Sequence, residues 1–143
     1  MNILSFDIED WFHILDNQET SSVESWNKFE SRLDEGVNRL IDVTVEHGYQ
    51  ATFFCLGWVA EKKPELIRQI SNAGFEVASH TYSHQLTYTQ APHEFKADLD
   101  RSLKTLEDTI GKKVISFRAP GFSFNESTPW AFEALIDAGI EFD

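Results

Sequence analysis

Residues 79–84 read Ser-His-Thr-Tyr-Ser-His, and the interpretation of the whole chain starts from this stretch. His80 and His84 are four positions apart, and the apolar run before them, Phe75 to Ala78, is typical of a short buried strand. On a helical turn, side chains four apart lie on the same face, so both imidazoles can reach one ion. Two imidazoles on a zinc-like metal usually take a carboxylate as the third ligand. The stretch predicts a metal site at the end of a strand. The competing interpretation is a polar loop in which one histidine bonds the backbone and the other is solvated.

Length and composition describe one globular domain. The chain has 143 residues, of which 41% are hydrophobic, so it can bury a core of its own. The net charge of −12 argues against nucleic acid or an anionic membrane as a partner, because both require clustered Lys and Arg. No apolar stretch approaches the ~20 residues of a membrane span. The start of the chain lacks the basic and apolar regions of a signal peptide, which predicts a cytoplasmic location.

The single Cys55 lies in an apolar run and is expected to be a buried structural thiol.

Apolar runs alternate with helical periodicity along the whole chain. Strands are predicted at 3–6, 51–56, 75–79, 114–117 and 140–142, and helices at 22–47, 64–73, 92–110 and 128–138. This alternation predicts an α/β fold of parallel strands joined by right-handed crossover helices. Five strands do not close the usual barrel of eight, and the chain stops inside the fifth. We therefore expect 1–143 to be a single, C-terminally incomplete domain, the N-terminal part of a (β/α) barrel, with a compact open sheet as the alternative.

Polar groups follow three of these strands at their carboxyl ends, where parallel α/β folds gather their functional sites. The groups are Asp7, Glu9 and Asp10 after the first strand, His80 and His84 after the third, and Arg118 after the fourth. All of them are expected on the same edge of the sheet. This coincidence favours the metal site over the polar loop.

Three motifs carry a family resemblance. They read Asp7-Ile8-Glu9-Asp10, His80-Thr81-Tyr82-Ser83-His84 and Arg118-Ala119-Pro120. In this order they resemble the motifs of the polysaccharide deacetylases, the NodB-homology domains of carbohydrate esterase family four. The segments at 51–54 and 57–60 are similar to the branch of that family associated with exopolysaccharide export. The acidic residues of the first motif are spaced more widely here than the adjacent pair that is usual in the family.

The resemblance implies a NodB-type barrel and a metal-dependent hydrolase. The expected reaction removes N-acetyl groups from an N-acetylhexosamine polysaccharide or its precursor, and Zn²⁺ is the expected cofactor. Asp7 would act as the general base. Asp10 would bind the metal together with His80 and His84, and Glu9 is the alternative to Asp10.

The resemblance also implies roles around these ligands. Arg118 would orient Asp7 through a charge-assisted hydrogen bond, and a purely structural salt bridge is the alternative. Trp11, Tyr82, Pro120 and Gly121 are expected to contact the carbohydrate, with the backbone of Gly121 as a candidate oxyanion donor. The histidine that serves the family as general acid would lie beyond Asp143.

Two other functions stay open at this point. A hydrolase of the same fold could act on cyclic amides or ureides instead of sugars. A non-catalytic module that binds metal or sugar is the second alternative, because the general acid is missing from these residues. The sequence leaves the polymer, the native metal and the oligomeric state undetermined.

Overall fold

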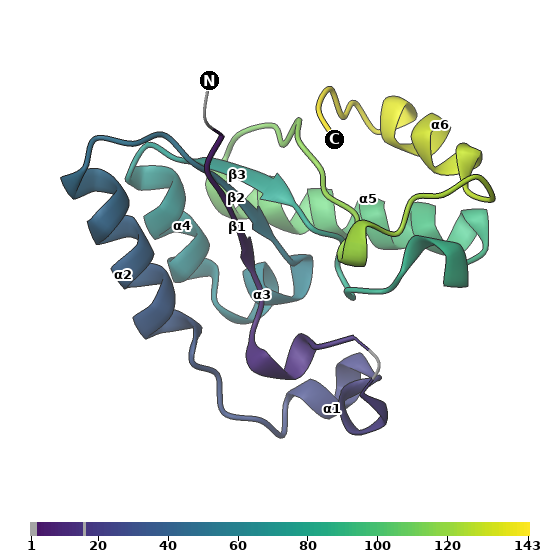
Figure 1. Ribbon diagram of the computed structural model, residues 1–143, viewed down its shortest axis with the longest axis horizontal. Helices are drawn as coiled ribbons and strands as arrows, with labels where there is room; N and C mark the ends of the chain where they lie inside the picture. The colour runs from purple at the N-terminus through teal and green to yellow at the C-terminus, as the bar shows by residue number, and fades with distance from the viewer. Residues whose placement is uncertain (1–2, 16) are drawn as a thin grey trace.

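The computed structural model describes residues 3–15 and 17–143, and it is built around a parallel sheet (Figure 1). Its three strands stand in the order β1-β2-β3, with bounds Ser5–Ile8, Thr52–Cys55 and Glu76–Ser79. The register places Asp7 beside Phe54, and Phe54 beside Ala78. The carboxyl ends of β1 and β3 therefore lie on the two sides of the end of β2.

The strands predicted at 114–117 and 140–142 are reduced to single bridges. Ser79 pairs with Phe117 and Ser116 pairs with Phe142, both in the parallel sense. The Arg118 N–H also donates to the Ser79 carbonyl at 2.9 Å. Both segments therefore run parallel to the sheet, as expected, although they do not form regular strands. The bond to Ser79 places Arg118 at the carboxyl end of β3.

Helices fill the connections between the strands. Their bounds are Val23–Trp26 for α1, Leu33–Glu46 for α2, Gly57–Lys62 for α3, Pro64–Asn72 for α4, Pro92–Ile110 for α5 and Pro129–Asp137 for α6. Short 3₁₀ turns occupy Trp11–His13 (η1), Gln18–Thr20 (η2), Thr87–Thr89 (η3) and Pro120–Phe122 (η4). The predicted helices α4, α5 and α6 are confirmed, each with proline in its first turn, where a missing N–H costs nothing.

The single helix predicted over 22–47 is wrong, because the chain is not helical between α1 and α2. In this stretch the Arg32 N–H donates to the Asp10 carboxylate at 3.1 Å. The Trp11 indole N–H donates to the Glu30 carbonyl at 3.1 Å. A continuous helix would use the same backbone groups in its own ladder, so these long-range bonds replace it.

The sequence prediction also missed α3. Its first four residues, Gly57 to Ala60, are all buried. Four consecutive buried residues show no amphipathic period, and α3 is too short to be distinguished from a strand by length.

Helices α4 and α5 pack against the sheet, whereas α1 and α6 lie away from its strands (Figure 1). Helix α4 packs against β3 and contacts α2 and α5, and α3 packs against α5. The core contains Phe53, Leu56, Ile67, Leu99 and Leu106, together with Cys55, which is buried as expected. Burial raises the pKa of the Cys55 thiol, so it stays protonated and unreactive.

The other side of the sheet faces a cavity of about 720 Å³. Its lining includes Ser5, Thr52, Phe54, Glu76 and Arg118, which come from the strands and from the bridged segment that follows β3. Arg118 links this open side to the carboxyl edge of the sheet.

Across residues 3–15 and 17–143, no helix has the length and apolar character that a membrane span requires.

Candidate active site and metal-ligand cluster

Three side chains with metal-ligating atoms converge at the carboxyl edge of the sheet. In the part of the chain that the structure describes, Glu9, His80 and His84 each offer one donor atom, and these atoms lie within 4.8 Å of one another. The His84 Nε2 is 3.0 Å from Glu9 Oε2, and the two imidazole centroids are 5.1 Å apart. Both histidines are buried. The two histidines therefore lie beside the Glu9 carboxylate, although residues 80–84 form a loop and not the helical turn assumed from their spacing.

Backbone carbonyls hold both imidazoles in one orientation. The Nδ1 atom of His80 is 2.8 Å from the Arg118 carbonyl oxygen, and that of His84 is 2.7 Å from the His13 carbonyl oxygen. Because a carbonyl oxygen only accepts, each Nδ1 carries the proton, and each Nε2 keeps its lone pair. Metal-binding histidines are oriented in this way by their second nitrogen. The donor set thus fits a divalent cation.

The electrostatics of the cluster keep the imidazoles neutral. Burial, and then the nearby His80, lower the pKa of His84 to about 4. Burial also lowers the pKa of His80. Neutral imidazole is the ligating form, so at neutral pH no proton has to leave either ring before a metal binds. Burial, and then the Asp7 charge, raise the pKa of Glu9 to about 7.

Asp7 stands at the edge of this cluster, held by Arg118. The guanidinium donates to Asp7 Oδ1 at 2.6 Å and to the Ser5 hydroxyl at 2.8 Å. Its central carbon lies 3.9 Å from the centroid of the Phe54 ring. The other oxygen, Asp7 Oδ2, is 3.9 Å from His80 Nε2. The ion pair that was one interpretation of Arg118 is therefore also the contact that orients Asp7.

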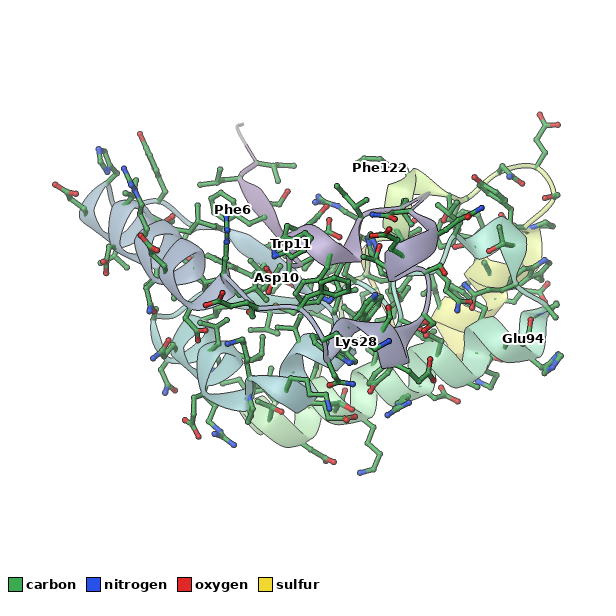
Figure 2. The ribbon with its side chains drawn as sticks, turned by 90° about the horizontal axis from the view of Figure 1, so that it is seen from below. Phe6, Asp10, Trp11, Lys28, Glu94 and Phe122 are labelled. Atoms are coloured by element: carbon green, nitrogen blue, oxygen red, sulfur yellow. The ribbon has the colours of Figure 1, made fainter. Side chains whose placement is uncertain are left out.

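Asp10 is not among the clustered residues, and Figure 2 shows it close to Trp11. Only 5% of the residue is exposed, and its Oδ1 accepts from the backbone N–H groups of Trp11 at 3.3 Å and Arg32 at 3.1 Å. Its carboxylate begins the turn η1 and joins that turn to the start of α2. One sequence signal points the same way: Asp7 and Glu9 are two apart, so an extended chain directs both to one side and Asp10 to the other.

The residues expected to contact the carbohydrate divide into a buried pair and an exposed pair. Tyr82 is 4% exposed, its hydroxyl donates to Glu61 at 2.8 Å, and Arg101 lies 3.6 Å from the centroid of its ring. This position turns Tyr82 toward α3 and α5, which does not fit the expected contact with a substrate. Pro120 is buried as well.

Trp11 and Gly121 form the exposed pair, because both are open to solvent. Trp11 is 52% exposed and follows Glu9 by two positions in the chain. Gly121 has a φ of +58°, and a Cβ there would lie 2.9 Å from Leu86 and 3.0 Å from Leu15. Both the conformation and the space require glycine at this position.

His13 is a site residue that the sequence did not reveal. It is 2% exposed, and its carbonyl orients His84. Its Nδ1 accepts from the Asp10 N–H at 2.8 Å, and its ring centroid is 4.3 Å from that of Trp26. A contact made by a backbone carbonyl depends on no residue type, so no motif marks it.

Comparisons with known proteins agree with this geometry. A family model described as polysaccharide deacetylase matches residues 18–141. The chain belongs to this family. It is 30% identical over 116 residues to a peptidoglycan-N-acetylglucosamine deacetylase of Bacillus cereus, a match that covers 76% of this chain and 42% of that protein.

Solved structures of this family share the fold. A structure from Mycobacterium smegmatis assigned to the polysaccharide deacetylases superposes with a TM-score of 0.79 at 26% identity, over 96% of this chain and 48% of that one. A CE4 family pseudoenzyme from Bacillus anthracis gives a TM-score of 0.74 at 20% identity, over 98% of this chain and 42% of that one. The chain therefore spans less than half the length of these proteins. The NodB-type fold expected from the sequence is confirmed, as a part of that domain with three parallel strands.

Proposed function

We propose that this chain carries the metal-binding and general-base part of an N-deacetylase site, which acts on an N-acetylhexosamine polysaccharide or its precursor. The observation that carries the proposal is the convergence of Glu9, His80 and His84 within 4.8 Å, beside the Asp7–Arg118 pair. The relative in Bacillus cereus, named for deacetylation of N-acetylglucosamine in peptidoglycan, supports this substrate class.

In this proposal Glu9, His80 and His84 hold the metal. Glu9 takes the third place instead of Asp10, because the Glu9 carboxylate lies within 4.8 Å of the donor atoms of both imidazoles, whereas Asp10 lies outside this group. Two imidazoles and one carboxylate form a donor set typical of catalytic Zn²⁺. When bound, the cation supplies a Lewis acid that polarises the acetyl carbonyl and lowers the pKa of the attacking water.

Asp7 is the proposed general base. Arg118 donates a hydrogen bond to Asp7 Oδ1. The other oxygen, Asp7 Oδ2, lies 3.9 Å from His80 Nε2 and can accept a proton from water at the edge of the cluster. Arg118 is itself fixed by Ser5 and by the Phe54 ring, so Asp7 is held in place before substrate arrives. The backbone N–H of Gly121 is the proposed donor to the oxyanion that develops as water attacks.

The decisive experiment is a substrate panel with the full-length, Zn²⁺-loaded protein. Acetate release from oligomers of N-acetylglucosamine supports the proposal, and the same assay with Asp7→Asn shows whether the reaction uses this site. The Asp100→Asn variant is a matched control, because Asp100 is an exposed carboxylate on α5. Hydrolysis of hydantoin without acetate release would replace the proposal by the cyclic amide alternative. Stoichiometric Zn²⁺ binding without turnover of either substrate would favour the alternative of a non-catalytic metal-binding module.

A further inference from the structure

The loop between the two histidines has a strained backbone. The φ angles of Thr81 and His84 are +68° and +52°, in the left-handed region that residues with a side chain rarely adopt. Such conformations persist only where the surrounding structure holds them, and they gather at functional sites. The contacts that hold this loop therefore decide where the two imidazoles point.

Helix α3 holds one side of the loop. Its first N–H groups donate to the loop carbonyls, from Gly57 to Thr81 at 2.9 Å and from Trp58 to Tyr82 at 3.3 Å. This approach depends on glycine, since a Cβ at Gly57 would lie 2.8 Å from both the Tyr82 ring and the Cα of Ser102. The loop carbonyls are thus satisfied by a helix end and not by solvent.

Helix α5 holds the other side, mainly through the carboxylate of Asp98. Its Oδ2 accepts the Tyr82 N–H at 2.7 Å, and its Oδ1 accepts the Ser83 N–H at 3.0 Å and also the Ser83 hydroxyl. The Ser102 hydroxyl adds a bond to the Thr81 carbonyl at 3.1 Å. The Asp98 side chain therefore accepts hydrogen bonds from both backbone N–H groups at the centre of the loop, one on each carboxylate oxygen.

We infer that Asp98 is a positioning residue of the metal site, which holds the loop so that the Nε2 atoms of His80 and His84 point at Glu9. It touches neither a proposed ligand side chain nor a reacting atom, and it acts through the backbone of residues 82 and 83. The inference rests on the metal site of the proposed function. Only a group with two acceptor oxygens satisfies both N–H bonds, so Asn, which has the same shape, turns an N–H donor toward one of them.

The test measures metal affinity and coordination, apart from turnover. Zn²⁺ affinity is measured by competition with a chromophoric chelator, and the absorption spectrum of the Co²⁺-substituted protein reports ligand geometry. The proteins compared are the parent chain, Asp98→Asn, Asp98→Ala and the α5 control Asp100→Asn. We expect Asp98→Asn and Asp98→Ala to bind Zn²⁺ about 10-fold more weakly and to change the Co²⁺ spectrum. This is the lower end of the effect of a direct hydrogen-bond partner of a ligand, because Asp98 acts through the loop backbone. The control should match the parent chain.

Thermal unfolding of the metal-free proteins separates positioning from simple stability, with all affinities measured well below the transition. If Asp98→Ala does not fold, the isosteric Asp98→Asn carries the test. Unchanged Zn²⁺ affinity and an unchanged Co²⁺ spectrum in folded Asp98→Asn would overturn the inference and leave the proposed function intact. Failure of the parent chain to bind Zn²⁺ or Co²⁺ would instead overturn the proposed metal site, and the inference with it.

Discussion

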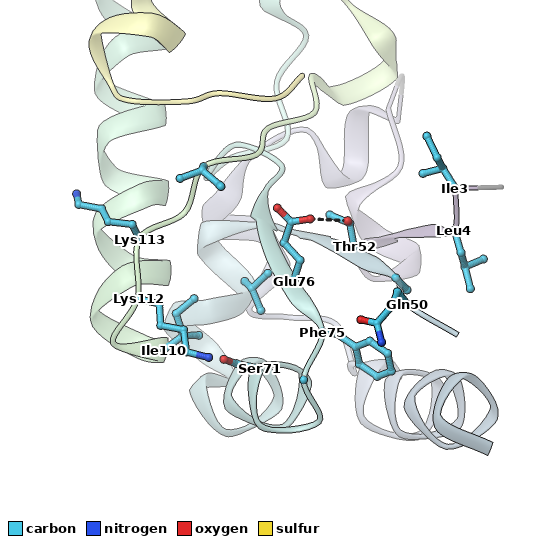
Figure 3. Close-up of a pocket in the computed structure, with 14 residues that line it drawn as sticks. Ile3, Leu4, Gln50, Thr52, Ser71, Phe75, Glu76, Ile110, Lys112 and Lys113 are labelled. Carbon is cyan, nitrogen blue, oxygen red and sulfur yellow. Dashed lines mark hydrogen bonds between the residues drawn. The ribbon is translucent and has the colours of Figure 1, made fainter. Parts of the chain in front are cut away.

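Charged side chains lie at both ends of the parallel sheet, but their arrangement differs between the two ends. At the carboxyl end, Glu9, His80 and His84 turn toward one another. At the amino end, a cavity of about 530 Å³ is lined by Glu76 and Lys113 among others. Figure 3 shows Glu76 directed at Thr52, with Lys113 on the far side of the cavity.

The difference lies in which hydrogen-bonding groups are already satisfied. The Glu76 carboxylate accepts from the hydroxyls of Thr52, at 2.6 Å, and Ser116. Lys113 pairs with Glu107 at 3.0 Å. At the carboxyl end the bonds to backbone carbonyls use only Nδ1 of each imidazole, and Nε2 remains available. A cavity with charged walls is thus not enough for a site, which needs free donor atoms aimed at a common point.

The largest effect is expected from removing an imidazole at the carboxyl end. His80→Ala and His84→Ala should each lose stoichiometric Zn²⁺ and, with it, deacetylase activity, because a ligand pair alone does not complete the site. Metal content after gel filtration measures this directly. Retention of one Zn²⁺ per chain in both variants would place the site elsewhere.

Asp7→Asn should separate chemistry from metal binding. The amide cannot accept the proton from water, so turnover should fall by about 10²–10⁴-fold, the usual contribution of a general base. Metal content should stay at the parent level, since Asp7 lies outside the group of three donors. Loss of the metal in this variant would make Asp7 a ligand and move the base to another carboxylate.

The neighbours Glu9 and Asp10 should respond in opposite ways. Glu9→Gln should weaken Zn²⁺ binding by at least about 100-fold, the upper end of what outer hydrogen-bond partners contribute. Asp10→Ala should keep the metal but lower the free energy of unfolding by about 1–3 kcal/mol, because the partly buried N–H groups of Trp11 and Arg32 lose a charged acceptor. Chelator competition and denaturant unfolding measure the two effects. The reverse pattern would return Asp10 to the ligand set.

The smallest effect is expected at the amino end. Glu76→Gln keeps the shape of the side chain and weakens its bonds to Thr52 and Ser116, which should lower the free energy of unfolding by about 0.5–1.5 kcal/mol. Zn²⁺ affinity and turnover should remain at the parent level. A change in Zn²⁺ affinity would show that the two ends of the sheet are coupled.

Much of this architecture was predictable because its signals are local. Proline in the first turn sets the starts of α4, α5 and α6, and the φ of +68° at Gly111 ends α5. The spacing of His80 and His84 is likewise visible within a few residues. The rule that functional groups gather at the carboxyl ends of parallel strands then brought these histidines together with Asp7 and Arg118.

The rest depended on contacts between distant parts of the chain. The break between α1 and α2 follows from bonds that Asp10 and Trp11 make to residues 32 and 30, which override the helical period. The choice of Glu9 over Asp10 depends on which carboxylate the fold places within reach of both imidazoles.

The orientation of the two imidazoles is the clearest case. The sequence by itself determined the fold class and the histidine pair, and the family resemblance implied the Asp7–Arg118 partnership. Tertiary structure alone decided where His80 and His84 point, because their Nδ1 atoms bond backbone carbonyls 38 and 71 positions away. It also placed the Asp98 carboxylate under the loop between them. A carbonyl oxygen is the same in every residue, so its role depends on where the fold places it and leaves no trace in the order of the side chains.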